Sequence, residues 1–286
     1  MDSSIATGAR PGTMSHVAAS RSTADRAAGA LRLAARGWFA VAAIGLSLFA
    51  VYVTLFYGGA VLRGDPAGWN KVLPKGYVAG EPLGNAVLAV HLALAVFVTL
   101  GGALQLVPQI RAAVPRLHRW IGRIYLIAVA VTSLGGTWLV WTRGTVGDLT
   151  QHVAITLNAV FIIGCGLLAW RHAVGRRFDV HRRWALRLFL VANGVWFFRV
   201  GLMLWLLIWQ RPVGFDPKTF AGPFLSFLSF AQCLLPLAVL ELYFFAQRPK
   251  RGAALRFGVA ALLALLTLAT AAGVFGAFMG MWLPRI

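Results

Sequence analysis

The most regular feature of this 286-residue chain is the alternation of long apolar segments with short polar ones. A helix needs about 20 apolar residues to cross the hydrocarbon core of a bilayer. Seven segments reach that length, at approximately residues 38–62, 84–107, 120–142, 151–170, 184–209, 222–246 and 255–283. Because the hydrocarbon contains no hydrogen-bond partners for the backbone, such segments must be helical. We therefore predict an all-α membrane domain, residues 38–286, that forms a bundle of seven transmembrane helices.

The first 37 residues differ from the rest of the chain. They are rich in Ala, Ser, Gly and Arg, and they lack the helical periodicity of apolar positions. This composition predicts a disordered basic tail over residues 1–37. The apolar segment that follows is about 25 residues long, which exceeds the apolar core of a cleaved signal peptide. We therefore expect this first segment to be a retained span.

Composition and charge agree with a membrane protein. Hydrophobic residues make up 59% of the chain and charged residues only 12%, whereas soluble domains carry about 25% charged residues. The 27 Lys and Arg against 8 Asp and Glu give a formal net charge of +19. Because the charges lie between membrane-length segments, we expect them to face anionic lipid headgroups, and we expect no nucleic-acid partner. Cys165 and Cys233 lie inside apolar segments without metal-ligand spacing and are expected to be core residues.

The basic residues alternate between the two sides of the predicted bundle. The tail and the second-to-third, fourth-to-fifth and sixth-to-seventh connections carry 19 of the 27 Lys and Arg, and the opposite segments carry 7. Lys and Arg accumulate on the cytoplasmic side of membrane proteins. The pattern thus predicts a cytoplasmic N-terminus and an external C-terminus.

Four histidines occupy four consecutive predicted spans, the second to the fifth. In the predicted orientation His91 and His152 lie toward the outer face, whereas His118 and His181 lie at the cytoplasmic face. Two layers of paired imidazoles would suit a ligand held between helices. The alternative for each is a histidine at the membrane surface beside arginines that follow the charge rule. For His91 that alternative is weaker, because histidines inside a membrane are uncommon.

Arg199 lies in the apolar interior of the fifth span, where a charge is costly enough to mark a functional candidate. It follows His181 by 18 residues, or five helical turns, which predicts the same helix side about 27 Å away. Arg199 is then expected near the outer histidines. The alternative is that its side chain extends to the membrane surface. Arg187 and Glu241 are expected to pair near the cytoplasmic end.

Several motifs resemble those of a bacterial family of predicted membrane proteins that is known only as a domain of unknown function. They are G-G-x-x-Q at Gly101–Gln105, R-x-x-x-P-x-L-H-R-x-x-G-R-x-Y at Arg111–Tyr125 and H-R-R-W-x-x-R at His181–Arg187, with Arg199 beyond. The resemblance covers about residues 86–210. It implies a multi-pass protein of the bacterial inner membrane and no established activity.

The arrangement of histidines also resembles that of diheme transmembrane b-type cytochromes. In those proteins four consecutive helices carry four histidines, and alternate helices pair to bind one heme near each membrane face. The resemblance implies that His91 pairs with His152 and that His118 pairs with His181, as ligands of heme b iron. The resemblance also implies that arginines pair with the heme propionates, namely Arg199, Arg119 and Arg182. Such a protein would carry single electrons to or from a quinone or another redox partner.

Two other classes of function remain open. A proton- or ion-coupled transporter would use His91, Arg199, Asn158 and Asn193 as a polar pathway; against it, no second half resembles the first, and no Gly- or Pro-broken pair of spans is apparent. A non-catalytic scaffold or assembly factor would use the arginine-rich connections to hold lipid or a partner. The chain lacks a carboxylate-rich metal cluster, a nucleotide-binding loop and a Ser-His-Asp pattern, so the sequence leaves open whether it is an enzyme.

Overall fold

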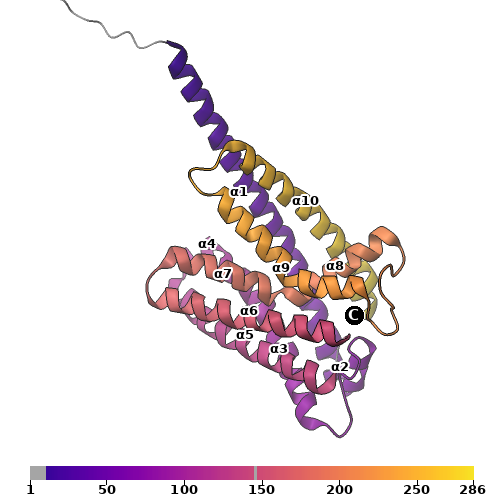
Figure 1. Ribbon diagram of the computed structural model, residues 1–286. Coiled ribbons are helices and arrows are strands. Elements are labelled where there is room, and N and C mark those ends of the chain that lie inside the picture. The colour runs from indigo at the N-terminus through magenta and orange to yellow at the C-terminus, as the bar shows by residue number, and fades with distance from the viewer. Residues whose placement is uncertain (1–10, 145–146) are drawn as a thin grey trace, which may run out of the picture.

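The computed structural model describes residues 11–144 and 147–286, and in these ranges it is helical without any β-strand (Figure 1). The α-helices are α1 (Pro11–Val53), α2 (Gly59–Leu62), α3 (Pro82–Leu106), α4 (Pro108–Ala113), α5 (Pro115–Arg143), α6 (Leu149–Val174), α7 (Phe178–Ala192), α8 (Gly194–Trp209), α9 (Pro223–Ala246) and α10 (Ala253–Ala277). Short π and 3₁₀ turns add η1 (Thr54–Gly58), η2 (Pro66–Lys71), η3 (Phe278–Trp282) and η4 (Leu283–Arg285). Among the described residues six helical segments are long and apolar enough to cross a membrane, and the bent pair α7–α8 is a seventh when it is counted as one span.

Local sequence explains where several helices begin and end. A proline opens α3, α4, α5 and α9, at a position where the missing N–H costs nothing. The Asp148 carboxylate caps α6 by accepting a hydrogen bond from the Gln151 backbone N–H at 3.1 Å. Gly144 ends α5 in the left-handed conformation, with φ of 57°. These signals keep the helices close to the lengths that the apolar segments predict.

The N-terminal segment differs from the disordered tail that the composition predicts. Residues 1–10 lie outside the described part of the chain, but α1 begins at Pro11 and continues without a break into the first span. Ala27 and Leu31 are buried, and Leu31 packs against Val259 and Leu263 of α10. The Ala-rich composition that suggested disorder also has the highest helix propensity, and packing on α10 stabilises the helix.

Four helices form a ring. α3 packs on α5, α5 on α6 and α6 on α7, and α7 closes the ring against α3. Its apolar interior contains Val98, Tyr125, Ile162 and Leu188, one from each helix. α1, α8 and α10 form a second group beside the ring, and α9 contacts both groups (Figure 1).

The bundle has two ends that differ in which helices start there. At the N-terminal end α5, α7 and α10 begin; at the C-terminal end α3, α6 and α9 begin, and the chain terminates. Figure 1 shows α2 and the C-terminus together at the C-terminal end.

The fifth span is broken in the middle, contrary to the unbroken helix expected over residues 184–209. α7 ends at Ala192 and α8 starts at Gly194, and the two axes differ by 54°. The side chain of Asn193 donates to the Phe189 carbonyl at 2.8 Å, and Asn158 of α6 donates to the Val191 carbonyl at 3.1 Å. These amides satisfy backbone groups that a break inside a membrane would otherwise leave unpaired.

Candidate functional site

The ring places the helices that carry the histidines on its diagonals. α3 with His91 lies across from α6 with His152, and α5 with His118 lies across from α7 with His181. His91 and His152 lie in the half of the ring toward the C-terminal end. His118 and His181 each lie in the first turn of a helix at the N-terminal end. The two layers are separated by the apolar interior of the ring.

His91 is held against α5. Its Nδ1 lies 3.0 Å from the backbone carbonyl oxygen of Thr132. Since a carbonyl can only accept, Nδ1 carries the proton, and Nε2 keeps its lone pair. Gly136 makes room for the ring, because a Cβ at that position would lie 2.8 Å from Cε1 of His91.

His152 is also held against α5, but on a different face. Its ring lies edge-on to Trp141 at 5.7 Å between centroids, and the Trp141 indole N–H donates to the hydroxyl of Thr156 at 2.9 Å. Trp141 follows Gly136 by five residues, about 140° around a helix. His91 and His152 therefore each contact α5 from their own side. The Nε2 atom of His152 is buried and has no hydrogen-bond partner among the described residues.

The second pair of histidines, His118 and His181, lies at the end of the bundle where arginines are concentrated. Nδ1 of His181 lies 2.9 Å from the Ala169 carbonyl oxygen of α6, which assigns the proton to Nδ1 as in His91. His118 is half-buried in the first turn of α5, and Arg119 follows it directly in the sequence. Both histidines therefore lie at the arginine-rich N-terminal end.

The three arginines predicted to accompany the histidines are divided between two places. Arg119 and Arg182 are exposed at the N-terminal end, directly after His118 and His181. Arg199 instead lies in the group formed by α1, α8 and α10, with its guanidinium 5.3 Å from the ring centroid of Phe49 and one N–H donating to the Val195 carbonyl. The expectation that it shares a helix side with His181 is wrong, because the 54° break separates the two residues.

Small residues beside the histidines serve helix packing. A Cβ on Gly102 would lie 2.9 Å from the Tyr125 hydroxyl and 3.3 Å from the Phe189 ring. This confirms that the Gly101–Gly102 pair lets another helix approach closely. The space at these glycines is filled by side chains of α5 and α7 and is not open to a flat ligand.

Sequence reasoning missed an aromatic cluster at the C-terminal end. The cluster is held between two π turns, η1 on the first span and η3 on the last. Tyr52 stacks on Trp282 at 6.2 Å and on Phe56 at 5.6 Å, and Phe56 meets Tyr57 edge-on at 4.8 Å. The hydroxyls of Tyr52 and Tyr57 are buried beside one another, and the buried indole nitrogen of Trp282 has no hydrogen-bond partner within the described ranges. π turns are often found at functional sites, but no apolar periodicity in the sequence indicates them.

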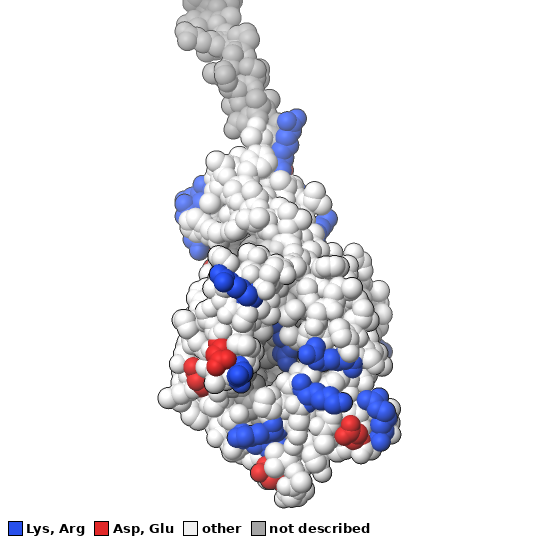
Figure 2. All heavy atoms as spheres, turned by 90° about the vertical axis from the view of Figure 1, so that its right-hand side faces the viewer, with Lys and Arg blue, Asp and Glu red and all other residues white. Residues whose placement is uncertain are grey.

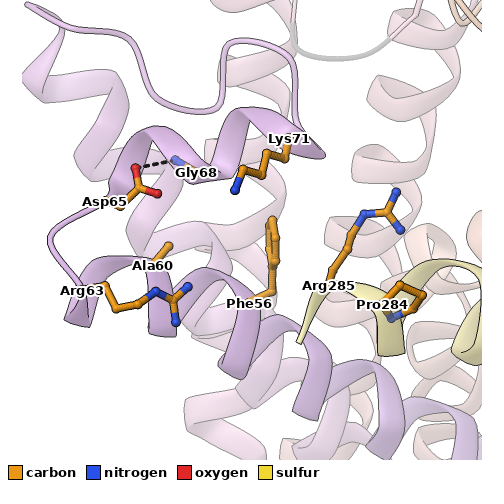
Figure 3. A pocket seen from close by; sticks show the side chains of 8 residues that line it. All are labelled: Phe56, Ala60, Arg63, Asp65, Gly68, Lys71, Pro284 and Arg285. Atoms are coloured by element: carbon orange, nitrogen blue, oxygen red, sulfur yellow. Dashed lines mark hydrogen bonds between the residues drawn. The ribbon is translucent and has the colours of Figure 1, made fainter.

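A cavity of about 390 Å³ opens beside this cluster. Figure 3 shows Arg63, Lys71 and Arg285 around the ring of Phe56. Asp65 also lines the cavity, and its carboxylate accepts a hydrogen bond from the Gly68 backbone N–H at 3.1 Å. Arg63 follows α2, Lys71 ends η2 and Arg285 ends η4, and the sequence shows the three only as separate basic residues.

Arg143 is a further residue whose role the sequence does not reveal. It is buried at the end of α5 and forms an ion pair of 3.0 Å with Glu81. Its other N–H groups donate to the Gly76 carbonyl at 3.1 Å and to Asn85 at 2.9 Å. Arg143 therefore ties the connection before α3 to the end of α5. The predicted pair of Arg187 with Glu241 is confirmed, at 2.6 Å.

These observations define a multi-pass helical membrane protein with a four-helix ring and, among the described residues, no cluster of three or more His, Cys, Asp or Glu able to hold a metal ion. The chain belongs to the family described as predicted membrane protein (DUF2306), whose family model matches residues 88–235, just over half of the chain. The match begins inside α3 and ends inside α9, so it contains the ring and the broken span. No curated protein and no solved structure matches the chain.

Proposed function

We propose that this chain is a b-type heme protein that carries single electrons between the two sides of a bacterial inner membrane. The proposal rests on the four-helix ring, in which the four histidines lie on diagonal helices in two layers. With the N-terminal end in the cytoplasm, the arginine-rich end faces anionic headgroups, and a quinone or another redox partner exchanges the electrons.

The observation that carries the proposal is the buried Nε2 of His152, which lacks a hydrogen-bond partner among the residues described. A buried imidazole nitrogen without a partner is costly, and with the proton on Nδ1 a ligand that takes the Nε2 lone pair would remove that cost. His152 lies on the helix diagonal to His91, whose own Nε2 is left with a lone pair by the hydrogen bond to Thr132. His181 has the same arrangement, through Ala169. A histidine that ligates a metal through one ring nitrogen usually donates the N–H of the other ring nitrogen to a group such as a backbone carbonyl, which fixes its orientation. These nitrogens are donors of the kind that ligate heme iron, and binding would require the helices of the ring to separate, because side chains fill its interior.

The protein's own residues have defined tasks in this proposal. Heme, when bound, supplies a reversible one-electron couple. The backbone carbonyls of Thr132 and Ala169 hold two imidazoles in one tautomer and orientation. Arg119 and Arg182 are available to pair with propionates at the N-terminal end. The apolar interior between the layers excludes water and keeps the two ligand pairs apart.

The test is to express the chain with a heme precursor and record the spectrum of the reduced protein. We expect His91→Ala and His181→Ala each to remove about half of the heme absorbance, and the double variant to remove all of it, because each change deletes one axial ligand of a different layer. His172→Ala, in the last turn of α6, is the control and should leave the absorbance unchanged. A colourless parent protein, under conditions that fill a control cytochrome, rejects the proposal.

A transporter is the second candidate, because the broken α7–α8 span is the kind of helix that forms substrate sites in transporters. At the break, however, the side-chain amides of Asn158 and Asn193 donate to backbone carbonyls of α7, so these N–H groups are already hydrogen-bonded within the protein. Of their oxygens, Oδ1 of Asn158 is buried without a partner among the described residues. A colourless protein whose transport activity is lost in Asn158→Leu would favour this candidate.

A further inference from the structure

The N-terminal end of the bundle contains a cavity that the histidine hypothesis does not use. Its volume is about 380 Å³, and it is lined by Ala28, Leu31, Arg32, Arg183, Gln247 and Arg256. These residues come from α1, α7, the end of α9 and the start of α10. Segments far apart in the sequence thus meet around it.

Three arginines line this cavity, and among the residues that the structure describes no Asp or Glu lines it. Within the described ranges the ion pairs are Arg143 with Glu81 and Arg187 with Glu241, so Arg32, Arg183 and Arg256 are not neutralised by the protein. Bringing like charges together raises their mutual repulsion. An anion bound between them would remove that cost.

Two of the three arginines are held in place. Arg256 donates from Nε to the Ala246 carbonyl at 3.2 Å and from Nη2 to the Arg248 carbonyl at 3.4 Å. The guanidinium of Arg183 lies 5.3 Å from the ring centroid of Phe244. Their positions are therefore set before any ligand binds, which lowers the entropic cost of binding.

The chemistry of the lining identifies the anion. Guanidinium groups match the oxygens of a phosphate, to which they donate two parallel hydrogen bonds. Besides Arg32, α1 contributes apolar lining at Ala28 and Leu31, and the cavity lies where α9 ends and α10 begins, at the level expected for headgroups. Basic pockets between transmembrane helices bind the headgroups of anionic lipids. We propose that this cavity is a binding site for the phosphate of an anionic phospholipid headgroup, independent of whether the chain binds heme.

The test compares two triple variants of the full chain in mixed vesicles of cardiolipin, phosphatidylglycerol and phosphatidylcholine. One variant changes the cavity, with Arg32→Gln, Arg183→Gln and Arg256→Gln. The control changes three exposed arginines at the same end, with Arg116→Gln, Arg171→Gln and Arg177→Gln. Both remove the same charge, so a general attraction to the membrane surface falls equally. The measurement is the phospholipid that remains bound after extraction into detergent, by native mass spectrometry.

We expect the unchanged chain and the control to retain anionic lipid in preference to phosphatidylcholine, and the cavity variant to retain at least tenfold less, because it loses charge-assisted hydrogen bonds. Equal retention by the two triple variants overturns the proposal.

A second arm of the experiment adds inorganic phosphate without lipid and measures thermal stability. If phosphate alone stabilises the chain through these arginines and no lipid is preferred, the ligand is a soluble phosphate and the lipid assignment is wrong. Should the triple variant fail to fold, Arg183→Gln alone, compared with Arg177→Gln, decides in the same way.

Discussion

The two ends of the bundle use arginine in opposite ways. At the C-terminal end, which faces the viewer in Figure 2, Lys and Arg are interspersed with Asp and Glu, and Arg143 is buried and paired with Glu81. At the N-terminal end, Arg32, Arg183 and Arg256 surround a cavity without a carboxylate. The first arrangement uses a charge to join segments of the protein. The second leaves charge available to a partner from outside, so the same residue type joins segments in one place and is available for binding in another.

The contrast between the two ends depends most strongly on their lying on opposite sides of a membrane. A reporter fused after Pro82 should be active only outside the cytoplasm, and one fused after Gly175 only inside, because the basic residues concentrate at the N-terminal end. Activity is measured in intact cells with paired reporters for the two compartments. The reverse result at either position would contradict the proposed orientation.

The next largest effect is expected at Arg143. Replacing it by Leu removes the partner of Glu81 and the donors to Gly76 and Asn85, so we expect the free energy of unfolding to fall by about 3 kcal/mol. Arg211→Leu, at an exposed arginine of the same end, should change it by less than about 0.5 kcal/mol. Thermal unfolding of the detergent-purified variants gives the comparison. Equal melting temperatures would show that Arg143 does not hold this end together.

The smallest effect is expected at Arg199, which lies within the membrane span but has no carboxylate partner in the part of the chain that the structure describes. Its contact with the ring of Phe49 accounts for about 1 kcal/mol or less. Arg199→Leu should therefore be nearly as stable as the unchanged chain in the same unfolding experiment. A loss as large as that of Arg143→Leu would indicate that Arg199 is a second structural arginine.

The helical membrane fold was predictable because a bilayer leaves few choices. A segment of 20 or more apolar residues has to satisfy its backbone internally, so length and composition alone predict a helix. The same rule does not say where a span breaks. The Asn193–Gly194 pair inside the fifth apolar segment was the available signal, since such a pair marks a turn, and its effect on Arg199 follows from the lost helical register.

The site was predictable only in part. Which helix carries each histidine, and in which half of the bundle it lies, follows from the order of the spans. The residue that each imidazole contacts does not follow from that order. The contacts of His91 with Thr132 and of His152 with Trp141 depend on how α5 is rotated in the four-helix ring. The same holds for the two π turns, which lie where aromatic residues of the first and last spans pack together.

The amino-acid sequence by itself determined the class of protein, the number of apolar segments and the family, because each of these depends on local composition or on motifs within one helix. Only the tertiary structure decided which charges are paired and which are free. Arg143 and Arg183 both lie near a helix end and both count as basic residues beside a span. Arg143 pairs with Glu81 and Arg183 lines a cavity with two more arginines, because these residues come from segments that the packing of the bundle brings together.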